Sequence, residues 1–228
     1  MPVAAYDEIA DWYADWVGGL HNSYSERVAD VLRRLIPPGD GRTSLDIGCG
    51  TGARAGVLRD LGWQPVGVDL STGQLRHARR ILPVAAADAT ALPIATGSVD
   101  LAVSILTHTD LPDYPGVIAE AARVVRPGGR FVHVGIHPCF TGAFADRSDP
   151  ARIVVDSGYH RRERRWDSFT TQGVRNRVGA WHLPLADLLN AFQAAGLEIV
   201  DTVESGPEAG VPDVFAVAAV SSPRQSAA

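Results

Sequence analysis

Residues 45–52, LDIGCGTG, decide the fold of this chain. A short apolar run ends at three closely spaced glycines, and a helical pattern follows from residue 53 to residue 61. Glycines in this position allow the backbone to turn tightly and to approach a ligand at the start of the next helix. We therefore expect a buried parallel strand, a ligand-binding turn and a helix, in that order.

Strand and helix patterns alternate outward from this motif. Further strands are expected at residues 65–71, 83–88, 99–106 and 130–136, with helices at 72–82 and 115–125 between them. This alternation predicts a doubly wound α/β fold, in which a parallel sheet carries helices on both faces. A helical pattern over residues 6–36 precedes the sheet, and a helix at 184–195 with two strands at 197–204 and 213–220 follows it.

The composition excludes several kinds of chemistry. All 21 basic residues are arginine, so no lysine is available as a Schiff-base former, phosphate-loop residue or general base. A net charge of −5 disfavours nucleic-acid binding through bulk electrostatics. No apolar run approaches the roughly 18 residues of a membrane span, and the acidic start of the chain is unlike a secretory signal. Two cysteines are too few for a zinc site, so we expect no metal. Together, these features predict a cytoplasmic protein with no nucleic-acid or membrane partner.

The spacing of glycines and acids indicates the kind of ligand. A dinucleotide fingerprint needs G-x-G-x-x-G, whereas here the third glycine comes one residue early and Asp46 precedes the first. A carboxylate there would repel a pyrophosphate but suits an ammonium group, which disfavours an NAD-dependent oxidoreductase. Asp69 ends the second strand, where it can accept hydrogen bonds from both ribose hydroxyls, and Asp88 with Ala89 ends the third, within reach of an adenine edge. The expected ligand is zwitterionic and carries adenosine.

These motifs resemble those of the class I S-adenosylmethionine-dependent methyltransferases, particularly the ubiquinone-biosynthesis-like group that acts on small molecules. The resemblance runs from residue 6 to residue 137 through LDIGCGTG, VGVDLS, AADATALPIATGSVDLAV and RVVRPGGRFVHV. It implies a Rossmann-like seven-stranded sheet with an antiparallel last strand, a helical N-terminal cap over the cofactor, and S-adenosylmethionine as that cofactor. After the fourth strand the chain reads SILTHTD instead of the Asp/Asn-Pro-Pro-Tyr type motif of enzymes that methylate nucleic-acid amines.

The resemblance also implies roles for single residues. The glycine turn borders the methionine moiety, the acid that ends the second strand holds the ribose, and the residues after the second and third strands contact the adenine. The pair after the fourth strand lines the methionine end, and two N-terminal tyrosines close over the cofactor. With the acid before the glycine turn, the expected cofactor-binding residues are Tyr6, Tyr13, Asp46, Gly48, Cys49, Gly50, Asp69, Leu70, Asp88, Ala89, Leu106 and Thr107. Cys49 has no base placed for it, so we interpret it as a small turn residue and not as a nucleophile.

We expect a single domain over residues 1–228. Its parts are a helical N-terminal cap at 1–40, a cofactor-binding core at 41–137, a substrate-determining insertion at 138–182, and a C-terminal helix with a strand pair at 183–228. In the insertion, regular patterns give way to loops, aromatic residues and an arginine-rich run at 161–165. That run either forms a solvated ion-pair face or recognises an anionic or aromatic acceptor.

Methyl transfer from a sulfonium needs in-line approach of the acceptor in a site that excludes water, and a base can assist it. Histidine is suited to that task because its pKa lies near neutrality. His108 follows the cofactor-lining segment, His137 follows the fifth strand, and His182 precedes the last large helix. These three are the catalytic candidates, with His160 as a weaker fourth, and each of them has a structural role as the alternative.

The expected function is methyl transfer from S-adenosylmethionine to an oxygen, nitrogen or carbon of a small organic acceptor. Secondary metabolites and quinone-like phenols are acceptors of this kind. The alternative is a non-catalytic module that binds S-adenosylmethionine as a regulator or partner subunit. Monomer and homodimer both remain open.

Overall fold

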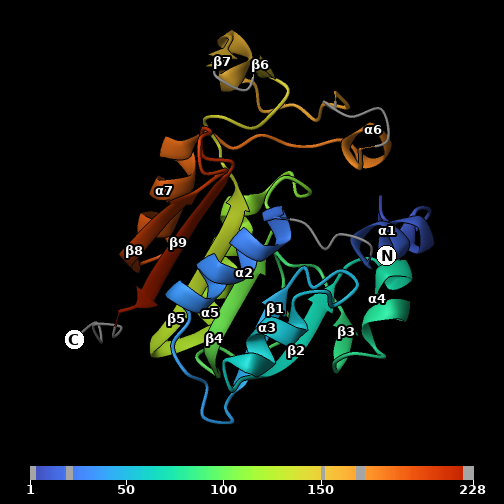
Figure 1. Ribbon diagram of the computed structural model, residues 1–228. Coiled ribbons are helices and arrows are strands. Elements are labelled where there is room, and N and C mark those ends of the chain that lie inside the picture. The colour runs from blue at the N-terminus through green and yellow to red at the C-terminus, as the bar shows by residue number, and fades with distance from the viewer. Residues whose placement is uncertain (1–3, 19–22, 150–151, 168–172, 223–228) are drawn as a thin grey trace.

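Seven strands form one mixed sheet, which Figure 1 shows with the strands labelled. The computed structural model describes residues 4–18, 23–149, 152–167 and 173–222. The strand order across the sheet is β3-β2-β1-β4-β5-β9-β8. The strands are β1 (Thr43–Ile47), β2 (Gln64–Asp69), β3 (Val84–Ala86), β4 (Val99–Ile105), β5 (Val125–Ile136), β8 (Leu197–Ser205) and β9 (Val214–Ser221).

The directions of the strands follow from their connections. β1 to β5 pair in parallel, and helices connect β1 to β2, β2 to β3 and β4 to β5. β8 and β9 are neighbours in the chain and pair antiparallel. β9 lies between β8 and β5 in the sheet, and it also pairs antiparallel with β5. The predicted seven-stranded sheet with an antiparallel last strand is confirmed.

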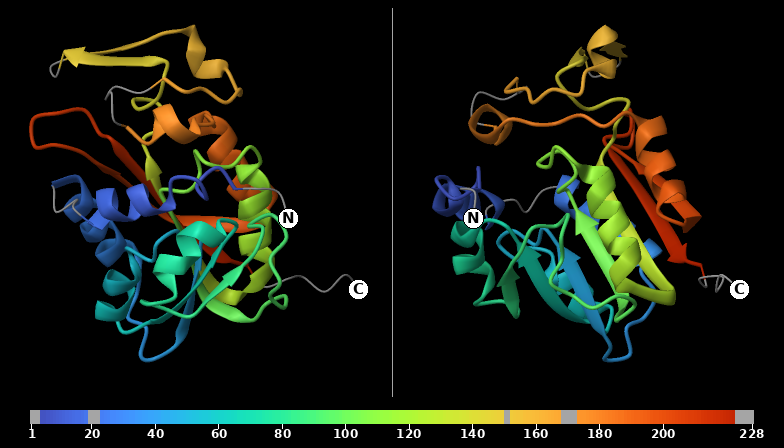
Figure 2. Two further views of the ribbon diagram at one scale, coloured as in Figure 1. Left: turned by 90° about the vertical axis from the view of Figure 1, so that its right-hand side faces the viewer. Right: turned by 180° about the vertical axis from the view of Figure 1, so that it is seen from behind.

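Helices cover both faces of the sheet, as the alternation predicted (Figure 2). α2 (Ser23–Leu35) and α3 (Ala55–Asp60) pack on one face, and α5 (Tyr114–Val124) and α7 (Leu185–Ala194) pack on the other. In α5, the fully buried Val117, Ile118, Ala121 and Val124 have the spacing that brings one side of a helix against a sheet. At the β3 edge, α1 (Ala10–Gly18) packs against α4 (Thr72–Ala78).

The strand order creates a crevice at one edge of the sheet. From β1 the chain moves outward through β2 to β3, and it then returns to place β4 on the other side of β1. The connections that leave β1 and β4 therefore turn away from each other, which opens space at the C-terminal ends of these two strands. Ligands of open α/β sheets bind at such a point.

The segment between β5 and α7 lies beyond the C-terminal ends of the strands (Figure 1). It contains a hairpin of β6 (Ala145–Asp149) and β7 (Arg152–Val155), the 3₁₀ helix η1 (Ser157–His160) and the short helix α6 (Arg175–Val178). The sequence predicted only loops here, because β6 and β7 have no alternating buried face: Val154 and Val155 are both exposed. Within the described ranges, no helix has the length and apolar character needed to cross a membrane.

Candidate functional site

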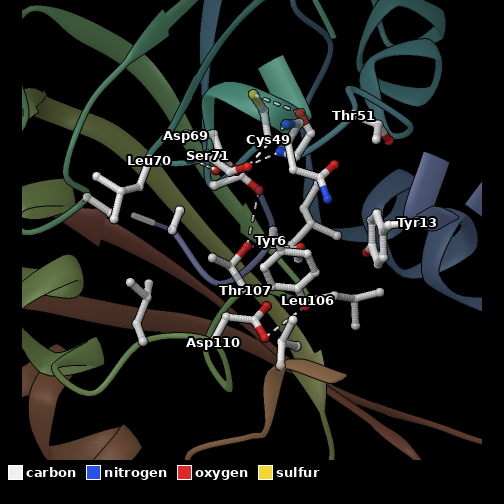
Figure 3. Close-up of a pocket in the computed structure, with 18 of the residues that line it drawn as sticks. Tyr6, Tyr13, Cys49, Thr51, Asp69, Leu70, Ser71, Leu106, Thr107 and Asp110 are labelled. Atoms are coloured by element: carbon white, nitrogen blue, oxygen red, sulfur yellow. Dashed lines mark hydrogen bonds between the residues drawn. The ribbon is translucent and has the colours of Figure 1, made fainter. Parts of the chain in front are cut away.

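A cavity of about 460 Å³ lies at the C-terminal ends of the parallel strands (Figure 3). The turns after β1, β2, β3 and β4 line it, at residues 48–51, 68–71, 87–89 and 105–107. The N-terminal segment adds Tyr6 and Tyr13, and the insertion adds Arg164, Val178 and Trp181. The volume falls in the range of small-molecule sites, about 300–1,000 Å³. All of the predicted cofactor-binding residues except Asp46 line this cavity.

The glycine turn requires glycine for two physical reasons. Gly48 has a φ of +73°, which side chains disfavour, and a Cβ at this position would lie 2.4 Å from the Cγ2 atom of Thr107. Thr107 is itself held against the turn, because its Oγ1 donates to the carbonyl of Gly48 at 3.3 Å. The turn after β1 and the turn after β4 therefore pack directly on each other at the cavity wall.

Asp69 is fixed by the backbone on both sides. Its two carboxylate oxygens accept hydrogen bonds from the backbone N–H of Gly50 and of Ser71, each at 2.8 Å (Figure 3). Burial raises the pKa of this carboxyl above its ordinary value, although the two N–H donors act in the opposite direction. The result is a preorganised acceptor at the end of β2, suited to the hydroxyls of a ribose.

Asp46 and Cys49 lie close to this wall but differ in access. Asp46 is 2% exposed and does not line the cavity. Burial, reinforced by the charge of Asp69, raises its pKa to about 7. Cys49 lines the cavity, yet burial and the neighbouring carboxylates raise the pKa of its thiol far above the ordinary value. A thiol of this kind is a poor nucleophile, as the sequence interpretation expected.

The turns after β3 and β4 complete the wall. The carboxylate of Asp88 accepts from the backbone N–H and the hydroxyl of Thr90, at 2.8 and 2.7 Å, so it forms the turn that presents the buried Ala89 to the cavity. Leu106 has a φ of +59°, an uncommon conformation for a residue with a side chain. Its N–H donates to the carbonyl of Val134 at 2.7 Å, which holds the turn in this conformation.

The N-terminal segment is attached to the core by polar contacts. The hydroxyl of Tyr6 donates to Oδ1 of Asp110 at 3.0 Å (Figure 3). The same oxygen accepts a hydrogen bond from Arg175 of the insertion at 2.6 Å. Asp7 accepts from the hydroxyl of Ser71 at 2.7 Å and from the N–H of Gly73 at 2.9 Å. Three segments that are far apart in the sequence thus meet at the cavity mouth. The sequence carries no signal for the Tyr6–Asp110–Arg175 cluster, because no motif connects its members.

The candidate histidines have different surroundings. His108 is 4% exposed and, with His182, lines a second cavity of about 150 Å³. His137 is 1% exposed and lines neither cavity; its Nε2 lies 2.7 Å from Glu204, and its Nδ1 accepts from the N–H of Cys139 at 3.1 Å. With both ring nitrogens engaged, His137 has the contacts of a structural residue. His160 is exposed and lines neither cavity.

The arginines of residues 161–165 are mostly paired within the protein. Arg161 lies 3.5 Å from Glu163, Arg162 pairs with Asp187, and the Nε of Arg165 donates to Asp167 at 2.9 Å. Arg164 differs, because it donates to the carbonyl of Val178 and also lines the first cavity. This cluster therefore combines the ion-pair face with one arginine at the candidate site. The described residues contain no group of three or more His, Cys, Asp or Glu side chains that could hold a metal ion.

Residues 45–133 match the protein family described as Methyltransferase domain. The chain is 33% identical over 182 residues to "O-methyltransferase cnsE" of Penicillium expansum, which covers 66% of each protein. It is 36% identical over 104 residues to "2-methyl-6-phytyl-1,4-hydroquinone methyltransferase" of a Synechocystis strain, over 42% of this chain and 32% of that one. A crystal structure of an S-adenosylmethionine dependent methyltransferase from Mesorhizobium loti matches with a TM-score of 0.69 at 25% identity, over 84% of this chain and 96% of that one.

The chain belongs to the class I S-adenosylmethionine-dependent methyltransferases. Its predicted enzyme class and cofactor are confirmed by these relatives. The chain spans about two thirds of the length of the first curated relative and about a third of the second.

The first cavity of this methyltransferase also contains groups that fit S-adenosylmethionine. Gln74 is 2% exposed and lines the cavity near Gly50, and neither atom of its side-chain amide has a partner among the described residues. A buried amide without partners is costly unless a ligand completes its hydrogen bonds. Asp69 would hold the ribose, and Arg54, which lines the same cavity, offers a cation to the methionine carboxylate.

Sequence reasoning missed Gln74 and Arg54, although both had a signal. Arg54 follows the glycine turn directly, and Gln74 lies in the first turn of the helix after the ribose acid. Residues in those places line the cavity because the turns before them do.

Proposed function

We propose that this methyltransferase transfers the methyl group of S-adenosylmethionine to a small organic acceptor with an acidic hydroxyl, such as a phenol. The observation that supports the proposal is the lining of the first cavity. One part of its wall consists of the turns that fit the cofactor, and another part consists of Arg164, Val178 and Trp181 from the insertion. An acceptor held under the insertion would therefore lie within the same enclosed space as the cofactor.

The cofactor supplies an electrophilic methyl group on a sulfonium. The protein therefore has to bind and orient the cofactor and the acceptor, and to exclude water from them. Asp69 is preorganised by its two backbone donors. Tyr6 and Tyr13 pack edge to face, with ring centroids 5.2 Å apart, on the N-terminal side of the cavity. Burial raises the pKa of Tyr13 to about 12, so its hydroxyl stays neutral and adds no charge to the site at neutral pH.

The choice of an acidic hydroxyl follows from the lining of the first cavity. None of its described lining residues is a histidine, and the carboxylate of Asp110 is already engaged by Tyr6 and Arg175. A phenol loses its proton far more easily than an alcohol, so it needs less help from a base. The names of the two curated relatives, an O-methyltransferase and a hydroquinone methyltransferase, agree with such an acceptor.

A direct test follows methyl transfer from isotopically labelled S-adenosylmethionine to phenol, catechol, resorcinol and hydroquinone, with aniline and benzyl alcohol as competing acceptor classes. We expect a labelled methyl ether or ring-methylated product from the hydroxylated rings and none from benzyl alcohol. The Asp69→Asn variant should bind the cofactor weakly and lose the product. Tight cofactor binding without transfer to any compound of the panel would instead support the non-catalytic module.

A further inference from the structure

The second cavity lies directly beside the first. Trp181 lines both, and the consecutive residues Thr107 and His108 line one cavity each. Its volume of about 150 Å³ is close to that of an engineered apolar cavity that binds benzene. One six-membered ring is therefore the size of group that this space accommodates.

The walls of the second cavity combine aromatic surface with two ring nitrogens that are unpaired in the described part of the chain, Nδ1 of His108 and Nε2 of His182. Phe144, which is 3% exposed, packs against His182 with ring centroids 4.4 Å apart. The Nε2 atom of His182 is buried and has no hydrogen-bond partner within the described residues. Buried polar atoms of this kind normally have a partner, so the lack of one points to a ligand group.

The hydrogen bonding of His182 determines what that ligand group must be. The backbone of Tyr159 acts on the ring as a hydrogen-bond partner that raises its pKa, and Nε2 has no partner among the described residues, so we assign the proton of the neutral ring to Nδ1. Burial lowers the pKa of His182 to about 4, so the ring is neutral at neutral pH. A neutral imidazole with its proton on Nδ1 presents a lone pair at Nε2 and accepts a hydrogen bond.

The charges around the second cavity do not favour an anion. The cationic residues Arg161 and Arg165 that line it pair with Glu163 and Asp167, which line it too. Arg175 pairs with Asp110. With each cation balanced, an uncharged group that donates a hydrogen bond fits better than a carboxylate or phosphate.

We infer that the second cavity is an acceptor subsite for a neutral hydroxylated six-membered ring, whose hydroxyl donates a hydrogen bond to Nε2 of His182. The ring packs against Phe144, and the rest of the acceptor passes Trp181 to reach the methyl-transfer region of the first cavity. This inference rests on the proposed function for the identity of the ligand as an acceptor. It assigns His182 a role in recognition, outside the cavity where the methyl group is transferred.

Binding of 4-fluorophenol to the full chain tests the subsite without any turnover. Its affinity is compared with that of fluorobenzene by ¹⁹F NMR, with and without S-adenosylhomocysteine. We expect 4-fluorophenol to bind about five-fold to ten-fold more tightly, the effect of one hydrogen bond. We also expect the ¹⁵N resonance of the His182 Nε2 atom to shift when 4-fluorophenol, but not fluorobenzene, is added.

Variants assign the effect to His182. The His182→Leu variant should lose the preference for 4-fluorophenol, and His182→Gln, which keeps an acceptor oxygen, should retain part of it. His160→Leu, at an exposed position that lines neither cavity, is the matched control and should behave as the unaltered protein. If His182→Leu does not fold, the ¹⁵N resonance of the unaltered protein decides the question alone.

The inference is overturned if neither probe binds saturably, if both bind equally, or if the His182 resonance does not move. Methyl transfer to phenols that persists beside any of these results would keep the proposed function and remove only the subsite. A specific 4-fluorophenol site without methyl transfer to any acceptor would keep the subsite and remove the proposed function.

Discussion

Replacing Asp69 by asparagine tests the cofactor site most sharply. Each carboxylate oxygen accepts one backbone N–H, from Gly50 and from Ser71. An amide keeps one acceptor oxygen but turns its NH₂ group toward the other donor, so one hydrogen bond of the turn is lost. The bonds expected from two ribose hydroxyls also become neutral instead of charge-assisted. The lost bond of the turn is missing from the free and the bound protein alike, so it affects folding and not binding. At about 1 kcal/mol for each of the two ribose bonds, binding should weaken by about 2 kcal/mol, or about 30-fold.

Stability should change far less than affinity in this variant. Burial raises the pKa of Asp69, which means that its charge is costly in the folded protein, and asparagine removes that cost. The lost hydrogen bond of the turn lowers stability, and the removal of the buried charge raises it. We expect these two effects nearly to cancel, so that the melting temperature without ligand changes little. Calorimetric titration with S-adenosylmethionine measures the affinity, and Asp60→Asn on the exposed side of α3 is the matched control. Equal affinity of Asp69→Asn and the unaltered protein would refute the assignment of this carboxylate to the ribose.

Three further changes probe the buried acid, the turn and the N-terminal cap. Burial raises the pKa of Asp46 from 3.8 to about 7, so between these pH values the folded protein holds a proton that the unfolded chain releases. The free energy of unfolding should therefore fall as pH rises through this window, by at most about 4 kcal/mol. Asp46→Asn should flatten that fall in urea titrations at pH values across the window; parallel pH profiles would contradict it. Gly48→Ala should lower the free energy of unfolding by about 3 kcal/mol or more and abolish cofactor binding, because it adds both an unfavourable φ and a contact of 2.4 Å with Thr107. Gly41→Ala, with a φ of +80° in open space, should lower the free energy of unfolding by only about 1–2 kcal/mol. Equal losses of urea stability in the two variants would show that the contact is unimportant. Tyr6→Phe removes the 3.0 Å bond to Asp110 and should speed dissociation of S-adenosylhomocysteine about five-fold in stopped-flow fluorescence, and an unchanged rate would show that this bond does not retain the cofactor.

Local signals were sufficient for the cofactor half of the fold. The glycine turn at residues 48–52 and the acid at Asp69 act through backbone geometry that a few neighbouring residues determine. The positions of β1, β2, β4 and their turns were therefore predictable, and the cavity is lined by the residues expected there. Asp46 is the exception: burial places it away from the cavity, and burial depends on neighbours that the motif does not specify.

The substrate half was much less predictable. The sequence identified the segment 138–182 as distinctive but not its hairpin, and the three histidine candidates were equivalent by position alone. Packing separated His137 from the other two, because Glu204 and Cys139 engage both of its ring nitrogens. Among the described residues, His108 and His182 each keep an unpaired ring nitrogen at the second cavity. The contact of His137 with Glu204 joins positions 67 residues apart, which periodicity and spacing do not report.

By itself, the sequence determined the doubly wound sheet, the ligand-binding turn and the kind of cofactor, since hydrophobic periodicity and glycine placement are properties of short segments. Only the tertiary structure decided how the N-terminal cap and the insertion close the site. Tyr6, Asp110 and Arg175 meet there because the fold brings three distant segments to the same edge of the sheet, where burial strengthens their pairing. The same folding places Trp181 between two cavities, and that arrangement has no counterpart in the linear chain.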